Sequence, residues 1–507
     1  MGFWQWLRKA EVVPPPVPPA PEPGPQEADP LAFGSISRAA ANGAPEDVAR
    51  VVAAFAAAPP GAWLALDREF WDPLGRPLAT TAEEGRRAEA AAVVAAGRAP
   101  VGVVRCALAA DGYVREAALG RLGELPETLA LPLLALRCAD PVHEVRAAAR
   151  RLAEALLAGE PSRPVPVLAP VAYALRERRH GDWLADRVDE LVRTDAAVRD
   201  AALANPHARA RRAAYRVAVA AGVLPVDRLL AVARADADPS VRRLAGTAAV
   251  ERAGDPSVLR PLLGSANAAL RAAAVWALAS AGDVRPAADA LADRAASVRS
   301  VAQVAVRRAG GDPAATYRRM VSSAPTAAAV AGLGETGEPA DAALVRPFLR
   351  DPVTRTRVAA VRALRRLGGA DPGELLPLLS DPRPAVARAA AVALRDAAFD
   401  LAPVRRLLGR GHPEHVRWAA FRLLRTRGTV ERLLGDLTLL GDPEDPLAAA
   451  AYGDLRTWLA QDAATAYAAP AGDTAAALAR ALRLAEPALA AGDVRRLRFH
   501  LGLPVTR

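Results

Sequence analysis

The sequence predicts an all-α solenoid, in which antiparallel helix pairs stack side by side. Hydrophobic residues make up 52% of the 507 residues and aromatic residues only 4%, so the apolar matter is mostly Ala, Leu and Val. Ala and Leu are strong helix formers. An apolar residue followed by Arg also recurs at intervals of about 30 residues. Repeats of this length indicate a solenoid, because each unit buries its apolar face only against its neighbours.

The N-terminus predicts two short segments. Residues 1–10 are aromatic and basic, with Trp4, Trp6, Arg8 and Lys9, and residues 11–30 form a Pro-rich linker. Such a linker favours an extended polyproline II conformation. Since exposed Trp is costly unless it docks, we expect residues 1–10 to dock on the solenoid, on a partner or at a membrane surface, where Trp and basic residues act together.

The rest of the chain divides into three helical regions. Residues 31–100 are irregular and predict an atypical helical N-terminal cap, and residues 431–507 lose the repeat signature and predict a helical C-terminal cap. Between them, residues 101–430 predict about eleven repeats. The aligned apolar position is occupied by Val114, Val145, Ala210, Val241, Leu270, Val298, Thr356, Val386 and Val416. Two longer gaps, each close to two periods, predict degenerate repeats near residues 178 and 327.

Each repeat carries the same local signals. A turn such as Asp238-Pro239 predicts a helix start, because Asp can cap a helix and Pro fits its first turn. Small residues three and four positions after the aligned residue lie beside it on one helical stripe, which we expect to be buried. A Gly that follows a basic turn predicts the helix end, as at Gly310, Gly368 and Gly428.

This pattern resembles the HEAT-repeat family, especially the short bacterial HEAT-like repeats first recognised in phycobilisome lyases. The resemblance covers roughly residues 100–430 and implies a curved superhelix with the second helix of each pair on the concave side. In HEAT-like families the repeated Asp and Arg often hydrogen-bond between neighbouring units as a ladder. The resemblance gives this structural role to Arg115, Arg146, Arg242, Arg271, Arg299, Arg357 and Arg417.

Other arginines point away from the expected buried stripe. Positions two and nine after the aligned residue lie about 200° and 180° from it, and they include Arg212, Arg243, Arg307, Arg365 and Arg425. On a concave face these side chains would form a basic strip that binds an acidic protein or a phosphate backbone. The alternative is a solvated face with Arg placed at helix ends.

The net charge of +10 and the pI near 10.5 favour anionic partners. The signal is diluted by 56 acidic residues, and the nearly exclusive use of Arg, with Lys9 as the one lysine, would also follow from coding bias. Cys106 and Cys138 lie in helical patterns and predict small buried side chains in a reducing compartment. Neither a long apolar run nor a signal-peptide pattern is found, which predicts a cytoplasmic protein.

No catalytic constellation is found in the sequence. HEAT-like glycosylases group Trp, Asp and Arg around a flipped base, and HEAT-like hydroxylases use several His-Glu pairs, whereas only His143-Glu144 has that order here. We therefore expect no metal, cofactor or small-molecule substrate. The leading hypothesis is a non-catalytic scaffold that binds a protein partner on the concave face. The alternative is nucleic-acid binding through that basic surface, and a HEAT-like lyase or hydroxylase is a remote third.

Overall fold

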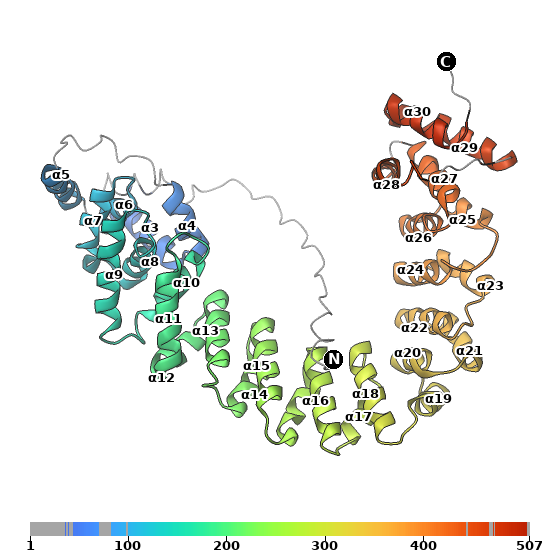
Figure 1. The fold of residues 1–507 in the computed structure, drawn as a ribbon, viewed down its shortest axis with the longest axis horizontal. Helices are drawn as coiled ribbons and strands as arrows, with labels where there is room; N and C mark the ends of the chain where they lie inside the picture. Colours follow the sequence, from blue (N-terminus) through green and yellow to red (C-terminus); the bar gives the residue numbers. More distant parts are fainter. Residues whose placement is uncertain are drawn as a thin grey trace. The chain divides into compact units, whose positions relative to one another are not determined.

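The computed structural model describes residues 36, 39, 44–69, 83–97, 100–442, 445–465, 470 and 472–503. Every regular element in these ranges is an α-helix or a short 3₁₀ helix (Figure 1). The chain forms two compact units that meet at Leu270 and Arg271, within helix α16. The segments predicted at 1–10 and 11–30 lie outside the described residues.

Unit 1, residues 1–270, is built from successive short helices. Their bounds are α3 (Pro45–Ala57), α4 (Pro60–Glu69), α5 (Glu83–Ala96), α6 (Val101–Leu108), α7 (Gly112–Leu119), α8 (Glu127–Arg137), α9 (His143–Leu157), α10 (Val165–Leu175), α11 (Asp182–Thr194), α12 (Ala196–Leu203), α13 (Ala208–Ala220), α14 (Val226–Ala235) and α15 (Pro239–Arg252). The 3₁₀ helix η2 (Pro256–Gly264) precedes α16.

Unit 2, residues 271–507, continues the same construction. Its helices are α16 (Ala268–Ser280), α17 (Arg285–Ala290), α18 (Ala296–Arg308), α19 (Pro313–Ser323), α20 (Ala327–Thr336), α21 (Ala342–Val345), α22 (Thr354–Arg366), α23 (Pro372–Leu375), α24 (Pro384–Ala393), α25 (Ala402–Arg406), α26 (Glu414–Leu424), α27 (Thr429–Leu440), α28 (Ala448–Gln461), α29 (Gly472–Ala485) and α30 (Ala491–His500). The 3₁₀ helices η4 (Arg346–Arg350) and η5 (Leu376–Ser380) extend α21 and α23.

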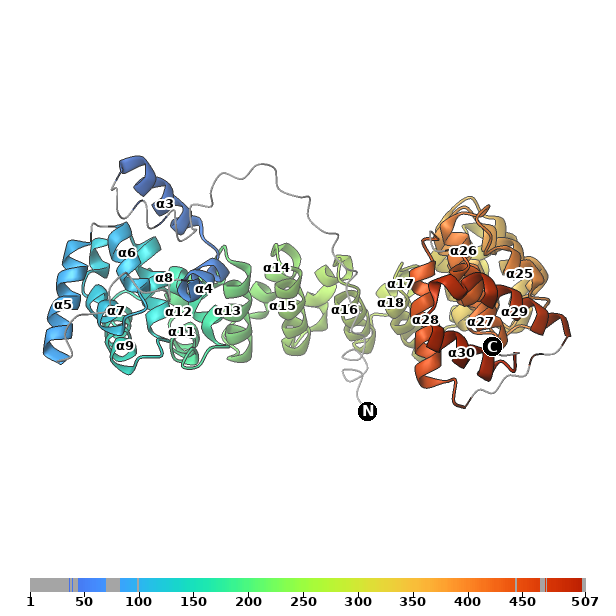
Figure 2. The same cartoon turned by 90° about the horizontal axis from the view of Figure 1, so that it is seen from above.

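The helices alternate between two stacked rows. We call the second helix of each pair, which carries the aligned residue, a B helix. Within unit 1, α9 packs on α7 and α13 packs on both α11 and α15 (Figure 2). Within unit 2, α22 packs on α20 and α24, and α24 packs on α26 (Figure 1). The fold is therefore an all-α solenoid. The helices α11 and α20 begin at Asp182 and Ala327, close to the positions 178 and 327 of the two predicted degenerate repeats. The number of repeats and the limits of the two caps at residues 100 and 430 stay predictions.

The predicted buried stripe is confirmed at the fourth position, whereas the residues at the third position are buried in α16, α18, α24 and α26 but only half-buried in α7, α9 and α15. The alanines four positions after the aligned residue are fully buried in α7, α9, α15, α16, α18, α24 and α26, namely Ala118, Ala149, Ala245, Ala274, Ala302, Ala390 and Ala420. Their small side chains let neighbouring helices approach closely. Cys106 and Cys138 are also buried free thiols, and burial raises the pKa of Cys138 to about 12.

The helix starts differ from the prediction at three Asp-Pro turns. Asp238 caps α15 directly and Pro239 opens it. At Asp140, Asp351 and Asp381, however, the carboxylate accepts the amide two residues later, and the helix begins at the second residue after the Pro. The Asp side chain satisfies the turn before the helix, so the Pro lies outside the helix. The predicted helix ends are confirmed at Gly310 and Gly368, which have positive φ and directly follow the C-caps of α18 and α22. At Gly428 the prediction is wrong, because α26 already ends at Leu424 and Gly428, also with positive φ, is the N-cap of α27.

In the described ranges no single helix is both long and apolar enough to cross a membrane. The helices α3 and α4 reach the required length only together, across a bend of 119°. Phe55 of α3 and Trp63 of α4 are both buried and their rings lie 4.9 Å apart. These apolar side chains therefore belong to the core of unit 1.

Candidate functional site

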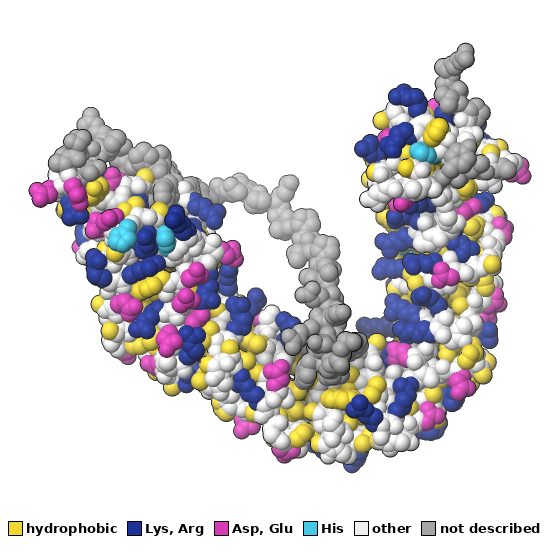
Figure 3. Space-filling view, in the orientation of Figure 1, with side chains coloured by type: hydrophobic (Ala, Val, Ile, Leu, Met, Phe, Trp, Pro, Cys, Tyr) yellow, Lys and Arg dark blue, Asp and Glu magenta, His cyan; other side chains and the backbone are white. Residues whose placement is uncertain are grey.

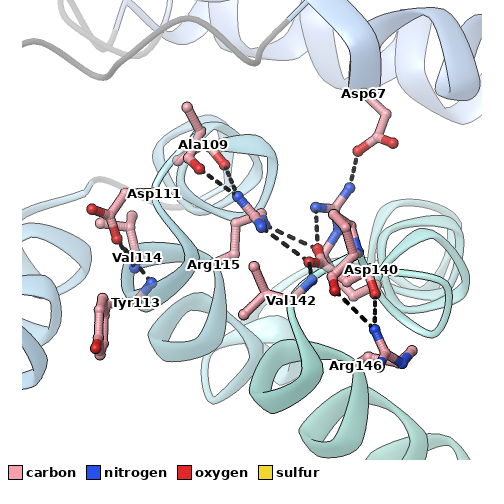
Figure 4. A network of polar contacts seen from close by, with 12 residues as sticks. Asp67, Ala109, Asp111, Tyr113, Val114, Arg115, Asp140, Val142 and Arg146 are labelled. Atoms are coloured by element: carbon pink, nitrogen blue, oxygen red, sulfur yellow. Dashed lines mark hydrogen bonds and ion pairs between the residues drawn. The ribbon is translucent and has the colours of Figure 1, made fainter.

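The arginines of the predicted ladder lie at the turns between the two helices of a pair. Arg115 of α7 donates two hydrogen bonds to Asp140, from Nε at 2.9 Å and from Nη2 at 3.0 Å (Figure 4). Its Nη1 reaches the carbonyl oxygens of Ala109 and Ala110 at 2.8 and 2.7 Å. Both charged side chains are almost fully buried. One guanidinium thus joins the turn before its own helix to the turn of the next repeat.

Four further ladder arginines bind a carboxylate of a following segment. Arg271 and Arg357 each form two hydrogen bonds, with Asp293 and Asp381 respectively, at 2.8–3.0 Å. Arg299 binds Glu335, and Arg417 binds Asp445. The carboxylates are 22 to 36 residues further along the chain, which is about one repeat.

Two ladder positions have a smaller set of contacts. Arg146 and Arg242 donate to carbonyl oxygens of their own turns, for example to Pro141 at 3.1 Å and to Ala237 at 3.1 Å. The structure also brings in Arg211, which binds Asp236 at 3.3 and 3.4 Å and which follows the weak aligned residue Ala210. Because Arg211 directly follows the aligned residue Ala210, the repeat pattern could have predicted this contact.

The five arginines predicted for a basic strip have different surroundings. Arg212 is paired with Asp238, and Arg425 is paired with Asp454. For the side chains of Arg243, Arg307 and Arg365 no hydrogen bond or ion pair is found among the described residues. All five are exposed. The predicted residues Trp4, Trp6, Arg8 and Lys9 lie outside the described part of the chain.

In unit 2, the B helices α22, α24 and α26 present one continuous basic face. It consists of the residues two, six and nine positions after the aligned residue, which lie about 200°, 240° and 180° from the buried stripe. We call this surface the arginine face, and its residues are Val358, Arg362, Arg365, Arg388, Val392, Arg395, Trp418, Arg422 and Arg425. Figure 3 shows dark blue side chains gathered along this edge of unit 2. The sequence-based prediction used only positions two and nine after the aligned residue, so it did not include Arg362 and Arg422, which lie at position six.

The arginine face carries uncompensated positive charge. Arg362, Arg365, Arg388, Arg395 and Arg422 are exposed, and none of these side chains has a carboxylate partner in the described ranges. The face also has apolar side chains between the charges. Val392 is 42% exposed. Trp418 is half-buried, and the guanidinium carbon of Arg422 lies over it, 5.3 Å from the centroid of the Trp418 ring. Trp418 is therefore a partly exposed residue of this face.

A pocket of about 640 Å³ opens in this face between α24 and α26. All of its charged lining residues are arginines, namely Arg388, Arg395, Arg422, Arg425 and Arg432. Trp418, Val392 and Leu423 supply part of its apolar wall. His415 lies at the edge, where its Nε2 is 3.0 Å from the carbonyl oxygen of Asp381. The pocket thus combines several guanidinium groups with an apolar surface.

Two buried aspartates lie behind the pocket. Asp454 accepts two hydrogen bonds from Arg432, at 2.8 and 2.9 Å, and one from Arg425. Burial opposes ionisation of Asp454, but these hydrogen bonds outweigh it and lower its pKa. Asp436 is fully buried, and burial together with the neighbouring charge of Asp454 raises its pKa to about 9. At neutral pH only Asp454 of this pair is charged.

Unit 1 has a smaller basic pocket of about 520 Å³ on α13 and α15. It is lined by Arg209, Arg212, Arg216 and Arg243. Two of the four are neutralised, since Arg209 pairs with Glu177 and Arg212 with Asp238. The pocket in unit 2 therefore carries the larger uncompensated charge.

A search for metal ligands in the described ranges finds no group of three or more His, Cys, Asp and Glu side chains that could hold an ion. The charged groups that do come together are arginines and their carboxylate partners. This arrangement can bind anions through charge-assisted hydrogen bonds.

No family model matches the chain, and no curated protein matches it either. Solved structures overlay on it loosely. An engineered protein is 18% identical, with a TM-score of 0.23, over 84% of this chain and 98% of its own. Kap95p in a complex with RanGDP is 14% identical, with a TM-score of 0.34, over 82% of this chain and 66% of its own.

Importin beta is 13% identical, with a TM-score of 0.31, over 93% of this chain. The chain spans about two thirds of the length of importin beta and of Kap95p, at 66% in each case. Superpositions this loose establish neither a shared function nor a shared partner. The function must therefore be inferred from the surface of this chain itself.

Proposed function

We propose that this protein is a cytoplasmic, non-catalytic scaffold that binds an acidic segment of a partner protein on the arginine face of unit 2. The observation that carries the proposal is the row of five exposed arginines without carboxylate partners in the described structure, on three B helices that pack directly on one another. A surface of this kind attracts and orients an anionic partner.

The apolar side chains on the arginine face favour a protein over a nucleic acid. Val358, Val392 and Trp418 lie between the arginines, and they offer contacts to the apolar side chains of an acidic peptide. A nucleic-acid backbone presents phosphates and sugars along its length, and its recognition is dominated by charge. Trp418 could still stack on a base, so nucleic-acid binding is kept as an outcome of the test.

The test compares the unmodified chain with two charge-reversed variants. Arg362→Glu with Arg395→Glu changes the arginine face, whereas Arg319→Glu with Arg350→Glu reverses two exposed arginines outside it, on α19 and η4. Each full-length protein is immobilised and exposed to native lysate, with and without nuclease. The bound proteins are then identified, purified and titrated back against all three proteins.

We expect a protein that binds the unmodified chain and the control variant, survives nuclease and is lost from the face variant. Its affinity should fall as salt concentration rises, because the contacts are ionic. Binding that requires intact nucleic acid would replace this function with nucleic-acid binding. A protein partner that the face variant still binds with unchanged affinity would move the interface away from the arginine face.

A further inference from the structure

The pocket between α24 and α26 has a special charge arrangement within the arginine face. Five guanidinium groups line it, and they fall into two groups. Arg425 and Arg432 are anchored from behind by one shared carboxylate, that of Asp454. Arg388, Arg395 and Arg422 have no carboxylate partner in the described ranges and are exposed. The pocket thus combines fixed and available hydrogen-bond donors.

The anchored arginines are held in place before any ligand binds. Arg432 uses Nε and Nη2 on Asp454 and donates Nη1 to Asp462 at 3.0 Å. Arg425 gives one Nη2 bond to Asp454 and lies over the ring of Phe421, while its side chain stays 41% exposed. Its remaining N–H groups are free to serve a ligand. Such preorganisation reduces the entropy that binding costs.

The carboxylates near the pocket leave most of its charge uncompensated. Asp454 serves two arginines at once, and Asp462 is about half exposed. Asp436 adds no negative charge at neutral pH, because its pKa is raised to about 9 by burial and by Asp454. Three arginines therefore face the pocket with neither a neutralising neighbour nor an acidic residue in the lining.

This number of donors exceeds what one carboxylate can accept. A carboxylate carries one charge on two acceptor oxygens, whereas a phosphate monoester carries nearly two charges and three acceptor oxygens and can therefore bind more of these guanidinium groups at once. Clusters of arginines are the usual means of binding phosphorylated motifs. Trp418 and Leu423 add an apolar wall against which the carbon atoms of a side chain can pack.

We propose that this pocket binds the phosphate of a phosphorylated side chain in the acidic segment of the partner. The inference rests on the proposed function and narrows it, because it predicts that phosphorylation of the partner controls its affinity. The α24 and α26 arginines would hold the phosphate, while Arg362 and Arg365 of α22 would contact the acidic residues beside it.

The test uses three fluorescein-labelled peptides rich in Glu that differ only at one central residue, which is phosphoserine, Ser or Glu. Binding to the full chain is followed by fluorescence anisotropy at physiological salt. We expect the phosphoserine peptide to bind at least about tenfold more tightly than either counterpart. In Arg388→Gln with Arg422→Gln all three peptides should bind more weakly, because both arginines belong to the arginine face, and the advantage of the phosphoserine peptide over the Ser and Glu peptides should disappear.

The matched control is Arg319→Gln with Arg350→Gln, which removes the same charge and should keep the phosphate advantage. Equal affinities for the three peptides would overturn the phosphate site and leave the acidic-segment scaffold in place. A phosphate advantage that survives in Arg388→Gln with Arg422→Gln would also overturn this pocket as its source. A labelled DNA oligonucleotide that binds when no peptide does would overturn the proposed function as well, as would no binding by any probe.

Discussion

The repeat turns and the arginine face use the same side chain for opposite purposes. At the turns, Arg115 and Arg357 are buried or nearly so and bind both a carboxylate and backbone carbonyl oxygens. On the arginine face, Arg388 and Arg422 are exposed and have no carboxylate partner in the described structure. The two sets differ by as little as one position along a B helix, which rotates the side chain by about 100°.

The difference teaches that arginine content alone says little about function in this chain. Five of the seven ladder arginines, one position after the aligned residue, reach a carboxylate about one repeat further along the chain. On α22, α24 and α26 the arginines at positions two, six and nine are exposed, and all of them except Arg425 have no carboxylate partner in the described ranges. If this distinction holds, substitutions at the turns should lower stability, and substitutions on the arginine face should lower binding alone.

The largest effect is expected at Asp140. It accepts hydrogen bonds from Arg115, from Arg137 at 2.8 Å and from the amide of Val142. Asp140→Ala would leave two buried guanidinium groups without this partner, so we expect a loss of about 3–5 kcal/mol in the free energy of unfolding of unit 1. Urea unfolding followed by circular dichroism measures this loss.

Asp351→Ala is the matched control, because Asp351 occupies an equivalent Asp-Pro turn but its carboxylate accepts only the amide of Val353. We expect it to cost about 1 kcal/mol, as for a lost cap. Equal losses in the two variants would show that the ion pairs at the turns add nothing to stability beyond local capping. The arginines at the turns would then not have the stabilising role that distinguishes them from the arginine face.

The second largest effect on stability is expected at Asp436, a buried residue beside Asp454, Arg425 and Arg432 of the pocket. Its pKa is raised to about 9, well above the value of about 4 of an exposed Asp. Between these two pH values the folded protein keeps a proton that the unfolded chain releases, so stability falls as pH rises. Asp436→Asn is neutral throughout, and we expect it to stabilise unit 2 by about 2 kcal/mol at pH 8.

The measurement is urea unfolding of both proteins at pH 5.5 and pH 8.5. The stabilisation by Asp436→Asn should be larger at the higher pH, because the stability that the unmodified chain loses by keeping its proton grows with pH up to the folded pKa of about 9. A variant that follows the same pH dependence as the unmodified chain would mean that Asp436 ionises normally and adds a negative charge behind the pocket.

A smaller effect separates two arginines at the same repeat position. Arg425 and Arg365 both lie nine residues after the aligned residue, but only Arg425 has a buried carboxylate partner. We expect Arg425→Ala to cost about 1 kcal/mol and Arg365→Ala less than about 0.5 kcal/mol, because an exposed arginine without partners contributes little. If thermal unfolding midpoints of the two variants coincide, the pairing with Asp454 does not stabilise unit 2.

The helical periodicity of the sequence was enough to predict the solenoid and its buried stripe, because Ala390 and its equivalents follow from a fixed spacing on a helix. The same reasoning placed Gly310 at a helix end. It wrongly assigned Asp140 and Asp381 as the caps of α9 and α24, whose N-caps are Val142 and Arg383, since an Asp can cap a preceding turn as readily as the helix itself. The choice between these two depends on backbone geometry, which the spacing does not specify.

The candidate site was only partly accessible from the sequence. Arg365 and Arg425 were selected by position, but nothing in the sequence distinguishes the paired Arg425 from the unpaired Arg365. That difference depends on Asp454, 29 residues away and outside the repeat pattern. Arg388 also stands two positions after an aligned residue and could have been selected, whereas the shared pocket with Arg422 requires the packing of α24 on α26.

The smallest effect on stability is expected for Arg388→Glu with Arg422→Glu. These side chains are exposed and without carboxylate partners in the described ranges, so reversing both should change the free energy of unfolding by less than about 0.5 kcal/mol. Arg422→Glu also removes the guanidinium over Trp418, a contact worth about 0.5–1 kcal/mol at an exposed site, but reversing two charges relieves part of the repulsion among the five arginines of the pocket, which offsets this loss. Unchanged urea unfolding together with lost binding of an acidic peptide would show that these arginines serve a ligand. A large loss of stability would instead show that these arginines stabilise the fold. The arginines of the arginine face would then differ from those at the repeat turns only in exposure.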